Sequence, residues 1–429
     1  MTLPEEILHF IWKYRLYHTP HMQTVSGKAL TVLDTGRPNP DAGADFLSAR
    51  VRIGETEWAG NVEIHVHSSD WALHRHHQDK AYNNVILHVV YDHDRDISRE
   101  DGTMPETLEL ASLIPVHVFP KYRELMGNMQ WIPCERLIHT VPAFHLSQWL
   151  SRLLIERFEY KITAIHELLA QQRGNWEETC YLWMARNFGF KVNAQAFEQL
   201  ARSIPQSLIA KHRTTPLAVE ALFFGQAGLL ENRVFKDEYP RRLQQEYQHL
   251  RQLHSLSPLD ASLWKFMRTR PGNFPSMRIA QFAALCLRAV HLFSVMLDTR
   301  EVGAIRALFE GLPVASYWEE HYRFDAYAMP HSRQLGKQSI DTLLINATAG
   351  ILFAYGKYVG KETYIYRAIA LLENLKSEEN AVTKRFSAIG VRARQAADSQ
   401  ALLQMKAFYC DKKKCLDCGV GLQLMKYNE

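Results

Sequence analysis

Hydrophobic and polar residues follow two different spacings along this chain. In the amino-terminal part they alternate in short runs separated by Gly, Asp, Pro and Asn, which predicts strands at 28–34, 45–53, 57–67 and 84–91. Helices are predicted at 2–16, from apolar residues at helical spacing, and at 69–80, which begins with a serine and contains no Gly or Pro. The second and third strands are close enough to form a hairpin around Gly54.

Beyond residue 140 the apolar residues recur every three or four positions, which predicts a mostly helical region. The predicted helices are 144–169, 176–188, 194–202, 217–224, 238–254, 278–297, 301–308, 339–353, 361–375 and 398–409. We therefore expect an α+β protein with an α/β domain over 1–139 and a helical domain over 140–429. The segment 270–275, rich in Pro and Gly, predicts a further division near 271.

Composition places the chain among ordinary globular proteins. It has 429 residues, 47% of them hydrophobic and 22% charged, so two or three domains are expected and no segment is biased enough to predict disorder. The net charge of +4 permits an anionic partner such as nucleic acid but does not require one. The acidic start lacks the features of a secretory signal, and the apolar stretches 283–297 and 342–355 are short, so a cytoplasmic location without a membrane partner is expected.

Histidines and carboxylates concentrate on the predicted strands. Seven of the twenty histidines lie between residues 65 and 93, namely His65, His67, His74, His76, His77, His88 and His93. Alternate residues of a strand share one face, so Glu63, His65 and His67 are expected to line one surface together. The hairpin around Gly54 brings Asp45 towards Glu63. Two carboxylates that converge on Mg²⁺ or Mn²⁺ leave coordination positions for water and phosphate oxygens.

The face of the strand on which Asp45 is expected imposes a condition on this site. Asp45 alternates in phase with Val51 and Ile53, which are expected on the buried face of the strand. A bend or bulge is therefore required for Asp45 to reach Glu63, and Gly60 is the expected position.

Other interpretations of the same residues stay open. Imidazole ligands favour Zn²⁺ or Fe²⁺, so a transition metal is an alternative, with the ligands His65, His67, His74 and His77. In a third interpretation Asp45 caps a turn while Glu63 and His65 face solvent. If Glu63 and His65 form the site, the histidines of the following helix are expected to face solvent; these are His74, His76 and His77.

The cysteines near the carboxyl terminus form a second candidate site. Cys410, Cys415 and Cys418 have the spacing C-x4-C-x2-C, and three lysines between the first two favour ionised thiolates and a soft metal. The spacing equals the three-cysteine part of a plant-type iron–sulfur motif, which needs a distant fourth ligand. Cys134, in a predicted loop, is the expected fourth ligand. The occupant is expected to be an iron–sulfur cluster or Zn²⁺, and free buried thiols remain the alternative.

The acidic and histidine pattern resembles the PD-(D/E)xK nuclease superfamily, whose core has the order helix, three strands, helix, strand. Asp45 stands where that family has the Asp of Pro-Asp, and Glu63-Ile64-His65 stands for Glu-x-Lys. The resemblance implies that Asp45 and Glu63 bind metal, together with a first-helix acid that would be Glu6 or Glu5. It also implies that His65 positions or deprotonates the attacking water. Some members hold a [4Fe–4S] cluster on one cysteine near the core and three near the end of the chain, at a different spacing.

Over nearly its full length the chain resembles an uncharacterised bacterial family, a domain of unknown function, which supplies no activity. The segments that carry this resemblance are 60–65, 81–90, 131–135, 273–275 and 409–418. Our first hypothesis is a metal-dependent nuclease that hydrolyses phosphodiester bonds of DNA or RNA. The alternative is a non-catalytic scaffold that binds nucleic acid or protein and carries a structural zinc or iron–sulfur site.

Overall fold

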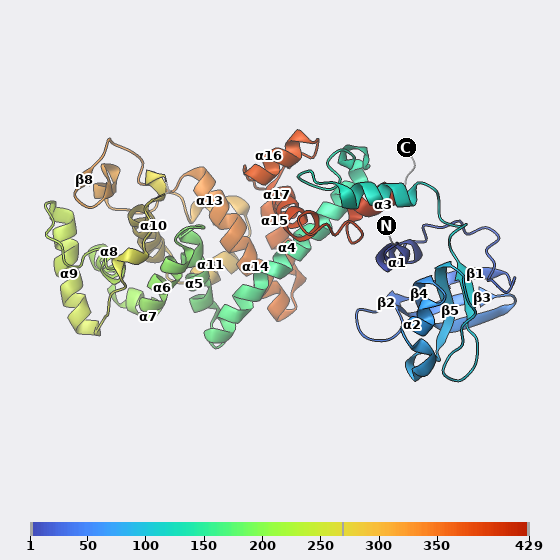
Figure 1. Cartoon of the computed structure of the whole chain (residues 1–429). Coiled ribbons are helices and arrows are strands. Elements are labelled where there is room, and N and C mark those ends of the chain that lie inside the picture. Colours follow the sequence, from blue (N-terminus) through green and yellow to red (C-terminus); the bar gives the residue numbers. More distant parts are fainter. Residues whose placement is uncertain (1–2, 268–269, 427–429) are drawn as a thin grey trace. The chain divides into compact units, whose positions relative to one another are not determined.

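The computed structural model describes residues 3–267 and 270–426, and it confirms an α+β protein with a mixed sheet in the amino-terminal part and a helical region after it (Figure 1). The chain forms two compact units. The first comprises Met1–Trp149, Ile389–Val391 and Met405–Glu429, and the second Leu150–Ala388 and Arg392–Gln404. The segment with the three clustered cysteines thus belongs to the first unit, whereas the sequence pattern assigned it to the helical domain. Both sides of residue 271 belong to the second unit.

The sheet of the first unit contains the four predicted strands. Its strands are β1 (Leu30–Asp34), β2 (Arg37–Pro38), β3 (Phe46–Ile53), β4 (Thr56–His67), β5 (Val85–Asp92) and β6 (Glu106–Glu109). The order is β1-β3-β4-β5-β6, with β2 pairing with β3; β1, β3 and β4 are antiparallel neighbours, while β4, β5 and β6 run parallel. The predicted hairpin around Gly54 is confirmed by the pairing of Ile53 with Thr56. The short strands β2 and β6 were not predicted.

Helix α1 (Glu5–Lys13) packs against β4 and buries Ile7, Leu8 and Ile11, as their spacing predicts. Thr2, where the predicted helix began, lies outside the described residues. Two further helices of this unit were not predicted, α3 (Val118–Gly127) and α18 (Gly419–Lys426), which pack against each other.

The prediction of one continuous helix over 69–80 is wrong. The chain forms α2 (Asp70–Leu73) and then two single 3₁₀ turns, His76–Gln78 and Lys80–Tyr82. Arg75, which lies between α2 and the first 3₁₀ turn, has the left-handed conformation with φ at 63°, which ends the helix. Trp71 of α2 is buried in a cluster with Ala44, Tyr82, Val85 and Ile97.

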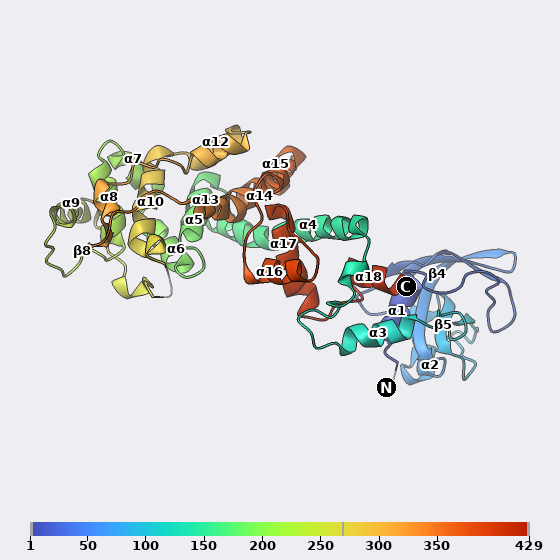
Figure 2. The same ribbon diagram turned by 90° about the horizontal axis from the view of Figure 1, so that it is seen from above.

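In the second unit the predicted helices other than 278–297 are confirmed with shifts of their ends, and α7 and α16 are additional. The helices are α4 (Ala143–Gln171), which carries the chain from the first unit to the second, α5 (Trp176–Phe188), α6 (Ala194–Ser203), α7 (Gln206–His212), α8 (Pro216–Gln226), α9 (Glu238–His254), α10 (Pro275–Arg288), α11 (Leu292–Asp298), α12 (Val302–Ala307), α13 (Lys337–Leu343), α14 (Ala349–Val359), α15 (Glu362–Glu373), α16 (Ala381–Ala388) and α17 (Ala396–Met405). Figure 2 shows the same helices after a rotation of 90°. The predicted helix 278–297 is wrong in being continuous, because α10 and α11 are bent by 67° at a short break.

The apolar stretch near residue 350 is longer than its sequence pattern predicted. Helices α13 and α14 continue through a π-helical turn (Leu344–Thr348) as one run of 23 residues, Lys337–Val359, which is long and apolar enough to cross a membrane. Of its most apolar window, 72% is buried inside the protein.

Candidate functional site

A β-bulge brings Asp45 opposite Glu63. Phe46 pairs with Val62, but Ala49 pairs with Gly60, so β3 carries one more residue than β4 over this stretch. Ser48 absorbs the extra residue with φ at 58°. The required bulge therefore exists, but on β3 rather than at the expected Gly60. Gly60 instead permits close approach of β5, because a Cβ there would lie 2.4 Å from Ile86.

Backbone hydrogen bonds hold the two carboxylates together. The Asp45 amide donates to Glu63 Oε2 at 3.1 Å, and the Ile64 amide donates to Asp45 Oδ2 at 2.9 Å. Asp45 and Glu63 therefore lie beside each other, and that both carboxylates share one ion with Glu6 stays a prediction. The prediction that the Glu63 and His65 side chains lie at the surface is wrong, however, since Glu63 is only 4% exposed and His65 only 1%.

Two imidazoles contact the buried Glu63 carboxylate, and a third contacts one of them. His76 Nε2 lies 3.0 Å and His65 Nε2 3.5 Å from Glu63 Oε1, and His65 Nε2 lies 3.1 Å from His74 Nδ1. One ring nitrogen from each of His65, His74 and His76 lies within 4.8 Å of the other two, a separation that a single metal ion can bridge. His65 Nδ1 also lies 2.8 Å from Nε2 of His88 on the neighbouring strand.

The break at Arg75 is what brings His74 and His76 together. In a continuous helix two residues two positions apart point to nearly opposite sides. The left-handed residue between them turns both rings to His65. The expectation that His76 faces solvent is therefore wrong, since its side chain is buried.

Burial makes the central histidines weak bases. It lowers the pKa of His65 to about 2, helped by the neighbouring His88, His76 and His74, and it lowers the pKa of His88 to about 3. Both rings are neutral near pH 7, the form in which imidazole binds metal. The ring nitrogens of His65, His74 and His76 lie close enough together to bind one ion, so the residues present fit a transition-metal ion.

The expected alternative ligands His67 and His77 are outside this group. The ligand set that the structure brings together has His76 in their place. The exposed His67 ring lies 3.3 Å from Asp92 instead.

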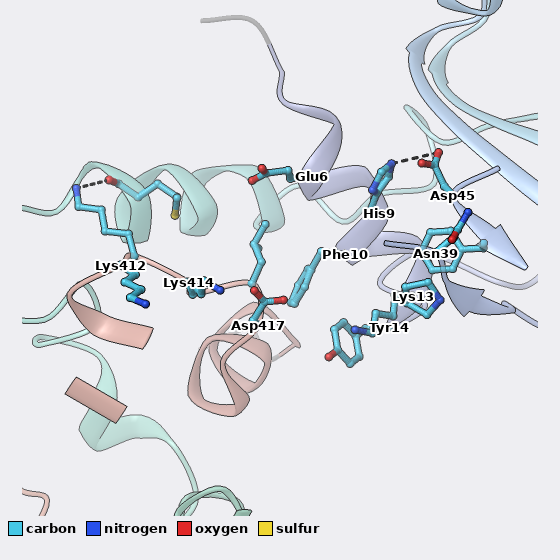
Figure 3. A pocket seen from close by; sticks show the side chains of 15 residues that line it. Glu6, His9, Phe10, Lys13, Tyr14, Asn39, Asp45, Lys412, Lys414 and Asp417 are labelled. Atoms are coloured by element: carbon cyan, nitrogen blue, oxygen red, sulfur yellow. Dashed lines mark hydrogen bonds and ion pairs between the residues drawn. The ribbon is translucent and has the colours of Figure 1, made fainter. Parts of the chain in front are cut away.

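An open cavity of about 520 Å³ borders the site at Asp45 (Figure 3). His9 of α1 points towards Asp45, with Nε2 3.3 Å from Oδ2. Burial lowers the pKa of His9, but the hydrogen bond to Asp45 and the nearby charges of Asp45 and Glu5 outweigh this and raise it above its usual value. Of the two candidate first-helix acids, Glu5 interacts with His74 and Asp45, while Glu6 lines the cavity.

Sequence reasoning missed His9, His76 and His88 as members of the site. A usable signal existed for His9, which follows Glu5 by four positions and so shares its helix face. His76 and His88 depend on the break at Arg75 and on the register of β5, which the hydrophobic pattern does not encode.

The structure brings the four expected cysteines together. Cys134, Cys410, Cys415 and Cys418 line one small cavity, and all six cysteines of the chain are free thiols. Burial and the neighbouring thiols raise the pKa of Cys134 and Cys410, and burial raises that of Cys415 to about 12. Among the described residues, no three of these sulfurs lie within 4.8 Å of one another.

A family model described as a protein of unknown function (DUF2851) matches residues 5–381. Comparison with curated proteins and with solved structures gave no match. The matched range contains α1, the sheet, the histidine cluster and most of the helices. The chain therefore belongs to the DUF2851 family of proteins of unknown function.

Proposed function

We propose that the protein is a metal-dependent phosphodiester hydrolase, a nuclease, whose metal ion is held by Glu63, His65, His74 and His76. The observation that carries the proposal is the convergence of three ring nitrogens beside a buried carboxylate. Three imidazoles favour a transition metal, so Zn²⁺ or Fe²⁺ fits this set better than Mg²⁺. When bound, such an ion would acidify a water molecule and neutralise charge on the phosphoryl group.

The geometry favours different roles for the two histidines that lie near Asp45 and Glu63. His65 is enclosed by His74, His76 and His88, so it is a metal ligand in this proposal rather than the base that activates water. His9 lines the open cavity and contacts Asp45, so it can exchange a proton with a substrate or with water. Asp45 orients the His9 ring through their contact.

The arrangement of the first unit supports the nuclease resemblance. Apart from the two-residue strand β2 and the 3₁₀ turns, the order α1, β1, β3, β4, α2, β5 follows the helix, three-strand, helix, strand order of the PD-(D/E)xK core. Asp45 and Glu63 face each other across β3 and β4, where that superfamily places its metal-binding pair. His65 in place of the usual lysine, and two additional histidines, distinguish this site from the family pattern.

The test combines metal analysis with cleavage assays. Purified protein is incubated with single- and double-stranded DNA and RNA and with Zn²⁺, Fe²⁺, Mn²⁺ or Mg²⁺, and metal content is measured by mass spectrometry. Glu63→Gln is expected to lose both bound metal and cleavage. Glu57→Gln, the same change on an exposed position of β4, is expected to keep both. Absence of cleavage with every metal, or cleavage unchanged by Glu63→Gln, overturns the proposal.

We further propose that the four cysteines hold a [4Fe–4S] cluster rather than zinc. Four thiolates on one Zn²⁺ lie about 3.8 Å apart, given tetrahedral bonds of about 2.3 Å. Among the described residues no three of the four sulfurs lie within 4.8 Å of one another, which suits a cluster of several atoms better than one ion. Protein purified without oxygen is expected to be brown and to contain iron. Cys134→Ser is expected to lose the iron, and Cys286→Ser, a change in the second unit, to retain it. Stoichiometric zinc without iron contradicts the cluster.

A further inference from the structure

The cavity beside Asp45 has a basic wall that the catalytic proposal does not use. Lys13 of α1 and the consecutive residues Lys412, Lys413 and Lys414 line it, together with three carboxylates. Lys413 Nζ donates to the backbone oxygen of Met126 at 3.0 Å. Among the described residues, Lys13, Lys412 and Lys414 form no ion pair with a carboxylate. These three ammonium groups are available for an anion.

Aromatic side chains accompany the lysines. Lys13 Nζ lies 5.2 Å from the ring centre of Tyr14, and the Tyr14 and Phe10 rings lie 4.9 Å apart. Tyr14 is half-buried and lines the cavity (Figure 3). Ammonium groups beside an accessible aromatic ring are the combination that binds single-stranded nucleic acid, because phosphates pair with the lysines and bases stack on the ring.

The lysines also lie between two members of the cysteine site. Cys410 and Cys415 flank them, and the turn that joins these cysteines is tight, with Lys413 in the left-handed conformation at φ 49°. The Lys414 amide donates to the Tyr409 oxygen at 2.9 Å, and the Cys415 amide to the Lys413 oxygen at 2.9 Å. The positions of Cys410 and Cys415 therefore set where the lysines point.

We infer that the cavity is a binding subsite for single-stranded nucleic acid, in which Lys13, Lys412 and Lys414 contact phosphates, Tyr14 stacks on a base, and the loaded cysteine site holds the lysine turn in place. The inference rests on the proposed function, since it assigns the substrate class of the same site. A strand in this cavity passes His9 and Asp45, the open side of the proposed metal centre. Loss of the metal from the cysteine site is therefore expected to weaken binding of the strand and not to change the hydrolytic step itself.

The experiment measures binding of a fluorescent single-stranded oligonucleotide to the Glu63→Gln protein by anisotropy over a range of salt concentrations. Each phosphate contact contributes about 0.7 to the slope of log affinity against log salt for a single strand. Adding Lys412→Gln and Lys414→Gln is expected to lower the slope by about 1.4. The matched control, Lys361→Gln with Lys384→Gln in the second unit, removes the same charge and is expected to leave the slope unchanged. Tyr14→Leu is expected to weaken binding about tenfold without changing the slope.

The cysteine part is tested with Cys415→Ser, with iron and zinc content measured beside the anisotropy. Loss of the metal is expected to lower the salt slope as the lysine changes do, although every lysine is still present. An unchanged slope in the metal-depleted protein overturns this link. Equal slopes for the lysine variant and its control, or equal binding of duplex and single strands, overturn the subsite.

Failure of this inference and failure of the proposed function are distinguishable. Lysine-dependent binding by a protein that cleaves nothing supports the subsite and removes the hydrolase. Cleavage that is unaffected by the lysine changes supports the hydrolase and removes the subsite.

Discussion

Acidification is expected to destabilise the sheet around His65 and His88 in the metal-free protein. Both rings are buried, and their pKa values are about 2 and about 3 in the folded chain, against the usual histidine value of 6.5. Below pH 6.5 the unfolded chain takes up two protons that the folded chain does not. Stability is therefore fully present above pH 6.5 and falls as the pH drops towards the folded-state values.

The magnitude follows from the distance below 6.5. Below pH 6.5 each histidine lowers the free energy of unfolding by about 1.36 kcal/mol per pH unit. Moving from pH 7 to pH 5 therefore lowers it by about 2 kcal/mol for one ring and about 4 kcal/mol for both. Neither ring is exposed enough for solvent to screen this effect.

Hydrogen exchange measured by mass spectrometry on peptides from β4 and β5 is the assay, because it reports local opening in a chain with two units. After correction for the intrinsic exchange rate, protection is expected to fall about a thousandfold between pH 7 and pH 5. His88→Gln removes one titrating ring and is expected to halve the fall in free energy, whereas a change at the exposed His139 leaves it intact. A wild-type loss below about 1 kcal/mol, or the same loss in His88→Gln, refutes the reasoning.

Two further predictions concern packing and proton transfer. Gly225→Ala is expected to lower the free energy of unfolding of the second unit by about 1–3 kcal/mol, because a Cβ there would lie 2.1 Å from the Tyr247 ring. The control Gly303→Ala in α12 places its Cβ in open space and is expected to be neutral or stabilising. Equal melting temperatures for the two variants contradict this prediction. His9→Gln is expected to lower kcat about 10²–10⁴-fold while the metal content stays unchanged. It is also expected to remove from the pH–rate profile the titration of a group whose pKa lies above the usual histidine value. If that titration is retained, His9 is not the proton-transfer group that Asp45 orients.

The sequence by itself determined the local elements. The strands at β1, β3, β4 and β5 and most helices of the second unit follow from periodicity, because burying one face of a strand or helix imposes a spacing of two or about 3.6 residues. The grouping of Cys134 with Cys410, Cys415 and Cys418 was also accessible, since their spacing and predicted loop positions set them apart from the cysteines of apolar helices.

Only the tertiary structure decided the composition of the histidine site. Whether Asp45 faces Glu63 depends on one extra residue at Ser48, and a single-residue shift reverses the face of every side chain before it. The convergence of His74 and His76 depends on one backbone angle at Arg75. Such bulges and breaks arise where packing around Trp71 and hydrogen bonds across the sheet outweigh local preference, and the pattern of hydrophobic residues carries no record of them.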